Sequence, residues 1–474
     1  MTANGRTSGV LKLSKNVEGS FPLQLNAVVG LTRLKVNGSI TDLAELAGVD
    51  VSFDMQGRNL DELYKFTGVA LPSTPPYKVR GKLVRQGNTW VASQMQGTLG
   101  SSDVSGTLTF DQSAEVAMLT GKLQSKLLDF EDLGPVIGML PSTRVSSTKK
   151  APSSPPAAEA AEAAKTSAAP KSSRPHASSK VLPTAVLDLA KLKSMNADVA
   201  YSASNIRHVK ELPLDKGSVR VMLKSGVLQL GPISLGVAGG SIAGTIKIDS
   251  NLAPAAFNAR LDVRGAQLNQ LFPTIETTKS SLGKVSGKFD LSGRGNSAAQ
   301  MLGGATGDVA MLMGRSEISN ILLEFIGLDG GEVIKFLVRG DRNVQLPCAA
   351  AAFDVKQGVM TSRAIVLDTS DTVINGRGQV SFADETLDLV LDPAPKDVSI
   401  LSFRSPLKIG GTFAAPTAFP DKTALVGRAG IALALAATVE TGPGEDADCA
   451  GVFANAQKGK ASARSASPSL KAVN

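Results

Sequence analysis

The chain has 474 residues, of which 42% are hydrophobic and only 4% aromatic, and it contains 47 glycines. This length is enough for about three ordinary domains with a sizeable core. The scarcity of aromatic residues and the many glycines favour short strands and turns over a helical bundle. The formal net charge of +8 would indicate nucleic acid only if it formed a surface, and its distribution excludes this.

The basic charge lies in two low-complexity stretches. Residues 141–180 hold seven Lys or Arg against two Glu, and residues 453–474 hold four Lys or Arg and no acid. Both stretches are rich in Ser and Ala, which predicts solvated disorder. Contact with anionic lipid headgroups is the alternative. Aromatic side chains for base stacking are almost absent there, so no nucleic-acid partner is expected.

Composition divides the chain into four parts. We predict a β-repeat block over 1–140, a disordered low-complexity linker over 141–180, a second β-repeat block over 181–450 and a disordered basic tail over 451–474. The longest apolar run, Gly430 to Val439, is about half of the roughly 20 residues that span a bilayer. The N-terminal residues have no apolar core of a signal peptide, so no export signal is expected.

Similar alternating strands recur far apart in the chain, as "VSGTLTFD" from Val104, "SIAGTIKID" from Ser241 and "INGRGQVSF" from Ile374. Each has one apolar and one polar face, with a glycine in the middle of the apolar face. A strand glycine permits a bend or a close approach. The candidate lining residues on these faces are Val104, Leu108, Phe110, Ile242, Ile246, Ile248, Val380 and Phe382.

The alternating strands belong to a longer repeat of strand, turn, strand, turn and strand that begins near Gly87, Gly226 and Gly358. The predicted fold is therefore mainly β: an elongated, twisted antiparallel sheet of repeated strand meanders, groove-like, with a few short helices packed on it. Alternation alone leaves two interpretations open, a closed sandwich core and a groove that accepts a ligand.

Short helical turns are expected where leucines recur three residues apart after a strand, at Leu60/Leu63, Leu268/Leu271 and Leu127/Phe130/Leu133. "GRGNSAAQMLGG" predicts a turn and a helix start capped by Asn296 or Ser297, not a phosphate loop. A longer helical segment is predicted near 316–339, with Ile318, Ile321, Leu322 and Phe325 on one face.

The sequence offers no constellation for catalysis, cofactor binding or metal binding. It has two histidines, His176 in the low-complexity linker and the isolated His208. The carboxylate pairs Asp384/Glu385 and Asp368/Asp371 lie in predicted hairpin turns, where Asp is favoured for local hydrogen bonds. We therefore expect no enzyme, no cofactor and no metal.

The chain has two cysteines, Cys348 and Cys449, which bracket the third repeat. They are too far apart in sequence for a zinc motif. A disulfide in an oxidising compartment and two buried free thiols are both consistent with the sequence.

Several motifs together resemble the AsmA family of bacterial envelope proteins across nearly all of 20–450: "FDMQGRNLDELYKFTGVALPSTPPYKVRGKL", "GSSDVSGTLTFD", "VLPTAVLDLAKLKSMNADVAYSASNI", "GRGNSAAQMLGG" and "GQVSFADETLDLVLDPAPKDVSILSFRSPLKIGGTFAAPTAFPD". The resemblance implies a long β-groove with an apolar interior, periplasmic and held in the inner membrane by an N-terminal helix. We do not expect this helix in the sequence, whose first residues contain no long apolar run. It also favours the Cys348–Cys449 disulfide.

The resemblance further implies a role in outer-membrane biogenesis, with phospholipid acyl chains moved between the inner and outer membranes through the groove. Anionic membrane surfaces or outer-membrane assembly proteins are further expected partners. The alternative function is a structural or regulatory module that affects outer-membrane protein assembly or targeting. No catalytic residue carries over from the family.

Overall fold

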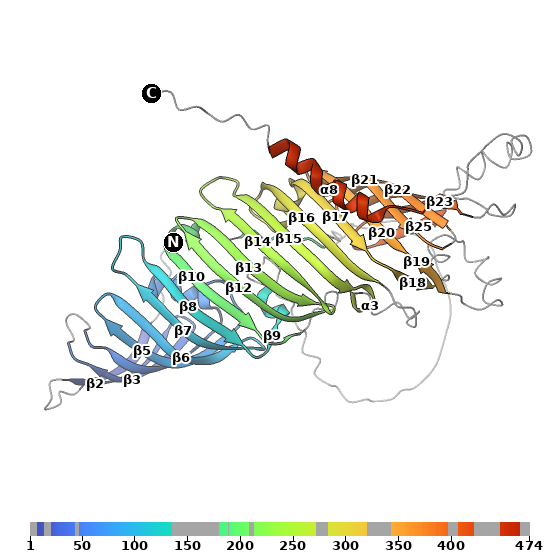
Figure 1. Ribbon diagram of the computed structural model, residues 1–474. Coiled ribbons are helices and arrows are strands. Elements are labelled where there is room, and N and C mark those ends of the chain that lie inside the picture. The colour runs from blue at the N-terminus through green and yellow to red at the C-terminus, as the bar shows by residue number, and fades with distance from the viewer. Residues whose placement is uncertain are drawn as a thin grey trace, which may run out of the picture.

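One large twisted sheet forms most of the computed structural model (Figure 1). The structure describes residues 7–13, 20–42, 47–134, 180–187, 189–207, 213–271, 283–319, 343–370, 372–396, 406–420 and 446–464. The sheet has 21 strands and is not closed into a barrel. The mainly β prediction is confirmed.

The strands follow one another across the sheet in chain order. The first block supplies β1 (Thr7–Leu13), β2 (Phe21–Val29), β3 (Thr32–Ile40), β4 (Asp50–Gly57), β5 (Tyr77–Gln86), β6 (Thr89–Leu99), β7 (Ser102–Asp111) and β8 (Met118–Ser125). The second supplies β10 (Asn196–Ala203), β12 (Leu214–Lys224), β13 (Val227–Val237), β14 (Gly240–Asp249), β15 (Ala256–Gln267), β16 (Lys284–Arg294), β17 (Thr306–Met313), β20 (Cys348–Lys356), β21 (Val359–Asp368), β22 (Thr372–Ser381), β23 (Thr386–Pro395), β24 (Leu407–Gly411) and β25 (Pro416–Pro420).

The two β-repeat blocks join into one sheet through a single exception to antiparallel pairing. Strand β8 pairs with β10 in parallel, with Leu119 opposite Ala197. Beside this junction, β9 (Leu128–Asp129) pairs in parallel with β11 (Ile206–Arg207). The repeats therefore stack into one continuous structure.

Short helices lie between strands. They are η1 (Leu60–Leu63), α1 (Tyr64–Thr67), η2 (Phe130–Leu133), η3 (Ala190–Lys193), α3 (Leu268–Leu271) and α4 (Ala298–Gly303), followed near the C-terminus by α8 (Cys449–Arg464). The predicted turns at Leu60, Leu268 and Phe130 are thus confirmed. Ser297 caps α4, because its side-chain oxygen accepts a hydrogen bond of 3.2 Å from the Gln300 backbone N–H.

The recurrent strand glycines bend the sheet. At Gly106 φ is +147°, and an added Cβ would lie 2.1 Å from the carbonyl oxygen of Lys122 on the next strand. At Gly378 φ is +139°, and the corresponding distance to the Asp388 carbonyl is 2.1 Å. The pairing of each of these strands with the strand before it also shifts register. The shift lies between Ala92 and Met95 of β6 and between Thr361 and Ile365 of β21. Bulges and glycines at the same register are the devices that curve a sheet.

Two predictions of local structure are wrong. Ser316–Ser319 is not the start of a helix but strand β18, which pairs with β19 (Asn343–Leu346), Ile318 opposite Val344. The strand that pairs with β18 lies more than twenty residues further along the chain, so the local sequence pattern did not show this pairing. The remainder of the predicted helix, 320–339, lies outside the described residues.

The predicted disordered tail is also corrected, because residues 451–464 belong to α8. Cys449, Val452, Phe453 and Ala456 recur at helical spacing, and they pack on Ala310 and the alanines of β20. Residues 465–474 lie outside the described residues, as do 141–179 of the predicted linker.

Candidate functional site

One face of the sheet is apolar from β2 to β25, and we call it the inner face. The register carries it across consecutive strands, as in Phe110 opposite Leu119, Leu119 opposite Ala197 and Ala197 opposite Leu223. At the paired positions of the 21 strands, Arg85 is the only charged residue on this face. Its guanidinium lies 5.1 Å from the centroid of the Trp90 ring, near a strand end.

Polar groups on the inner face bind each other. The Tyr77 hydroxyl lies 3.1 Å from Thr32 Oγ1, and the Tyr201 hydroxyl donates a 2.8 Å hydrogen bond to Ser125 Oγ. Burial raises the pKa of both Tyr77 and Tyr201, so both phenols stay neutral at physiological pH. The inner face therefore presents hydrocarbon and satisfied hydroxyls, with little to attract water or ions.

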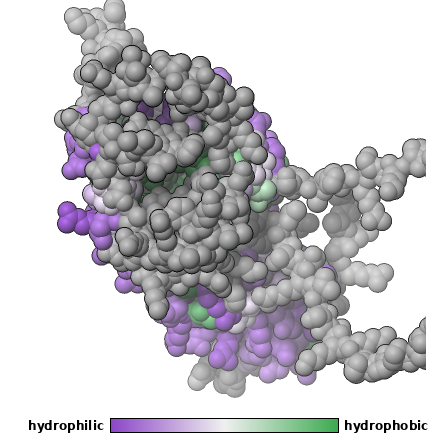
Figure 2. All heavy atoms as spheres, turned by 90° about the vertical axis from the view of Figure 1, so that its right-hand side faces the viewer, coloured by the Kyte–Doolittle hydropathy of each residue, from purple (hydrophilic) through white to green (hydrophobic). Residues whose placement is uncertain are grey.

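The outer face carries the charges. Arg220 binds Asp198 on the neighbouring strand at 2.6 Å, Lys82 binds Asp50 at 3.0 Å, and Arg377 pairs with Asp392. The Arg220 hydrogen bonds hold the pKa of Asp198 below its usual value. The two faces thus differ in kind, hydrocarbon inside and ion pairs outside. In the end-on view of Figure 2, hydrophobic residues show inside the hollow, whereas the outer surface is mainly hydrophilic.

All predicted lining residues lie on the inner face, but their surroundings differ. Val104 and Phe110 are 8% exposed and belong to buried clusters. Leu108, Ile242, Ile248, Val380 and Phe382 are half-buried and pack at the margins of such clusters. Ile246 is half-buried and belongs to none of the buried clusters formed by the described residues. Contact with a lipid stays a prediction for every one of them.

The inner face around Ile246 forms the floor of a trough between two rims of turns. One rim carries the β14–β15 turn, α4 and the β22–β23 turn; the other carries η1, η2 and α3. At the first rim, Met301 of α4 and Leu187 pack over inner-face side chains near the ends of β15–β17 and β20–β22. Phe130 of η2 packs near Val237 and Ala266 at the second. Side chains therefore pack over the inner face at both rims, whereas Ile246, between the rims, is half-buried and belongs to none of these clusters.

A segment over 180–187 and 189–195, which we call the strap, runs along the first rim. The buried Glu385 carboxylate accepts hydrogen bonds from the backbone N–H groups of Val181 (2.5 Å) and Leu182 (3.3 Å). Further along, the Leu187 N–H donates to the Asn296 carbonyl at 2.8 Å. Glu385 was expected in a hairpin turn, where it lies, but its role in holding the strap was missed, since the bound segment is about 200 positions away in sequence.

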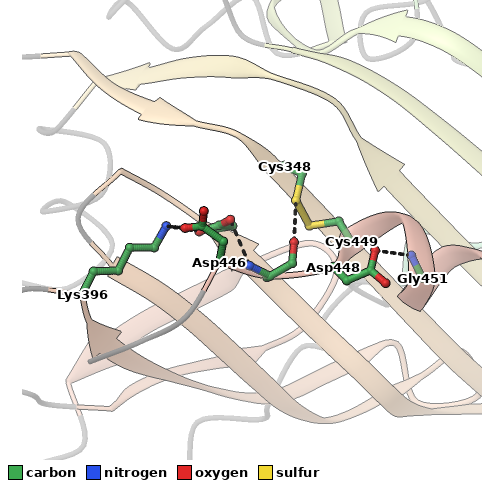
Figure 3. The surroundings of a disulfide bond; sticks show 8 residues. Cys348, Lys396, Asp446, Asp448, Cys449 and Gly451 are labelled. Atoms are coloured by element: carbon green, nitrogen blue, oxygen red, sulfur yellow. Dashed lines mark hydrogen bonds and ion pairs between the residues drawn. A yellow bond between two sulfur atoms is a disulfide. The ribbon is translucent and has the colours of Figure 1, made fainter. Parts of the chain in front are cut away.

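The cysteine pair lies on the outer face. Cys348 of β20 and Cys449 at the start of α8 form a disulfide, with Cα atoms 6.2 Å apart (Figure 3). Asp448 caps the helix by accepting a 2.8 Å hydrogen bond from the Gly451 N–H. The disulfide that the family resemblance favoured is therefore present.

Asp368 ends β21 beside the disulfide and is only 2% exposed. Its carboxylate pairs with Lys396 Nζ at 2.7 Å and accepts a 3.1 Å hydrogen bond from the Ala447 N–H. Lys396 also contacts Asp446 at 2.6 Å (Figure 3). Asp368 was predicted to cap a turn locally; it instead fixes the segment that leads into α8. Asp371 lies outside the described residues.

Comparison with known proteins gives the family that the sequence motifs resemble, the AsmA family. The model of the AsmA family matches residues 2–365, and the chain belongs to this family. Family membership supports an envelope-related function. No solved structure gave a significant match.

A curated relative is the AsmA family protein YhjG of Escherichia coli (strain K12), which is 35% identical over 445 residues. The alignment covers 93% of this chain and 62% of the relative, so the chain spans less than two thirds of that protein. Among the described residues, no helix has the length and hydrophobicity needed to cross a bilayer.

Proposed function

We propose that this protein is a non-enzymatic module of the cell envelope that carries phospholipid acyl chains along its inner face between the inner and outer membranes. The observation that supports the proposal most strongly is the continuity of that face from β2 to β25. Strands about 4.8 Å apart give it a contour of about 90 Å. An acyl chain spans half of a bilayer's hydrocarbon core, about 15 Å, so several could lie along it.

The energetics suit transport. Each methylene group gains about 0.8 kcal/mol when it leaves water, so an acyl chain has reason to stay on the face. The face is apolar along its length and carries no repeated charged group, so no single position holds the chain much more tightly than the next. The charged outer face lies in water, and the lipid headgroups stay in water as well.

The test is native mass spectrometry of the purified protein, which should retain phospholipid. Ile246→Asp should lower the retained lipid severalfold while the protein stays folded, because Ile246 lies outside the buried clusters. Lys247→Asp is the matched control: it places the same carboxylate one residue away on the exposed outer face, and retention should not change.

The alternative function, a structural module whose inner face is a closed core, predicts a different result. If the inner face served only as a core for a module that binds assembly proteins, Ile246→Asp would unfold the protein and no lipid would copurify with the wild type. That pair of results would refute the proposal.

A further inference from the structure

The segment 58–76, which joins β4 to β5 and contains η1 and α1, leaves one rim of the trough and crosses its inner face. We call it the insert. Leu60, Leu63 and Leu71 pack against the cluster that contains Tyr77, Val79 and Val104. These leucines cover the inner-face side chains of β5–β8. In other parts of the sheet, side chains at the same positions form the floor of the trough.

The tip of the insert reaches the opposite rim. Val69 and Ala70 pack against a cluster that contains Phe110, Leu119 and Met195, at the far ends of β7, β8 and β10. The Ala70 N–H donates a 3.2 Å hydrogen bond to Met195 Sδ, and Met195 is 2% exposed. The insert thus spans the trough from rim to rim.

A polar latch joins the insert to the strap. Lys191 of the strap forms an ion pair with Asp61 of the insert, and both side chains are 27% exposed. The same ammonium lies 5.9 Å from the centroid of the Tyr64 ring. Exposed or half-exposed ion pairs contribute little free energy, so this contact can open and close without unfolding the sheet.

We propose that the insert and the strap form a gate on the trough, latched by Lys191 and Asp61. The inference rests on the proposed function, because the insert occupies the apolar surface that an acyl chain would use. In the latched state the leucines of the insert take the place of a lipid. Passage beyond β5–β8 then requires the insert to lift away from the strap.

The experiment uses Asp61→Cys/Lys191→Cys, with and without a short bismaleimide cross-link. The native cysteines are bonded to each other, so only the introduced thiols react. The measurement is the rate at which the protein takes up a fluorescently labelled phosphatidylethanolamine from phosphatidylcholine vesicles. The cross-linked protein should take up the probe about tenfold more slowly than the wild type, since a closed lid limits exchange.

The released state is tested by Lys191→Met, which should take up the probe about fivefold faster, as expected for loss of a half-exposed ion pair.

The matched control for the cross-linked variant is Asp50→Cys/Lys82→Cys, which removes an ion pair of the outer face and carries the same cross-link without spanning the trough. Its rate should equal that of the wild type.

The outcomes separate the gate from the proposed function. A wild type that takes up lipid, together with a cross-linked insert that does so at the same rate, overturns the gate alone. Absence of uptake by the wild type overturns the proposed function and the gate with it. An equal slowing by both cross-links would also overturn the gate, because the effect would then not depend on the trough.

Discussion

Two parts of the same sheet are covered from opposite sides. Over β5–β8 the insert lies on the inner face. Over β17 and β20 the helix α8 lies on the outer face (Figure 1). Strand alternation is the same in both places. The difference is in the opposite face. At β5–β8 it is a charged surface, whereas at β17 and β20 it is apolar and is covered at the first rim by Met301 and Leu187.

Side-chain size on the outer face marks where the helix sits. Ala310, Ala350 and Ala352 stand where other outer-face positions carry Arg, Lys or Asp, and they let the backbone of α8 approach closely. The inner cover has no covalent bond and is latched by Lys191 and Asp61. The outer cover is fixed by a disulfide. One arrangement suits a part that moves, and the other suits a part that stays.

Removing the disulfide should have the largest effect on this comparison. Cys348 and Cys449 are 101 residues apart, and in the chain-entropy account a loop of that size stabilises the fold by up to about 4.7 kcal/mol. Cys348→Ser/Cys449→Ser should lower the free energy of unfolding measured in urea and make α8 sensitive to protease.

The control for that variant is the wild type in reductant, with alkylation and mass measurement to confirm the free thiols. It should behave as the serine variant does. Amide exchange in the insert should be the same in both, because the insert is held independently of α8. A reduced protein as stable as the oxidised one would contradict the fixed outer cover.

Glycine bends recur along the sheet, in β7 and in β22, so the loss of each should cost the same. Gly106→Ala and Gly378→Ala each place a Cβ about 2.1 Å from a backbone oxygen of the next strand, and each should destabilise the protein by about 3 kcal/mol. Gly87→Ala is the control. Its φ is +59° with no atom within 4 Å of the added Cβ, so the cost should be about 1 kcal/mol. Unequal effects of the first two variants in thermal unfolding would show that the covers, not the bend, set local stability.

Much of this architecture could be predicted because it is local and repeated. Alternation along "VSGTLTFD" fixes which side of β7 is apolar, and its glycine marks the bend. Leucine spacing located η1 and α3. The helix α8 carried a signal too, Cys449, Val452 and Ala456 on one side, but the surrounding Ser/Ala composition concealed it.

The parts that could not be predicted depend on long-range contacts. Lys191 pairs with Asp61 across 130 positions, and Glu385 holds the start of the strap across 204. Neither contact has a local pattern, since any surface lysine and aspartate look alike in sequence. Whether the apolar face is covered was equally invisible: Val104 and Ile242 occupy equivalent places in their repeats, yet only Val104 lies in the cluster that the insert covers.

The smallest predicted effect concerns the anchor of α8 and depends on pH. Burial by itself lowers the pKa of Lys396, but hydrogen bonds and charge attraction from Asp368 and Asp446 outweigh it, so the pKa is raised above the usual value. A raised lysine pKa stabilises the folded state fully below the unfolded pKa of about 10.4. The stabilisation is lost as the pH rises through the folded pKa.

Lys396→Met should therefore lower the free energy of unfolding by about 1 kcal/mol at pH 8. The difference from the wild type should shrink as the pH rises above about 10.4, measured by urea unfolding at each pH. Taking the difference removes the contributions of Tyr77 and Tyr201, which ionise in the same range in both proteins. A difference that stays constant with pH would mean that the Lys396 ammonium does not help to hold the segment before α8. The outer cover would then depend on the disulfide and on the packing of Val452, Phe453 and Ala456 alone.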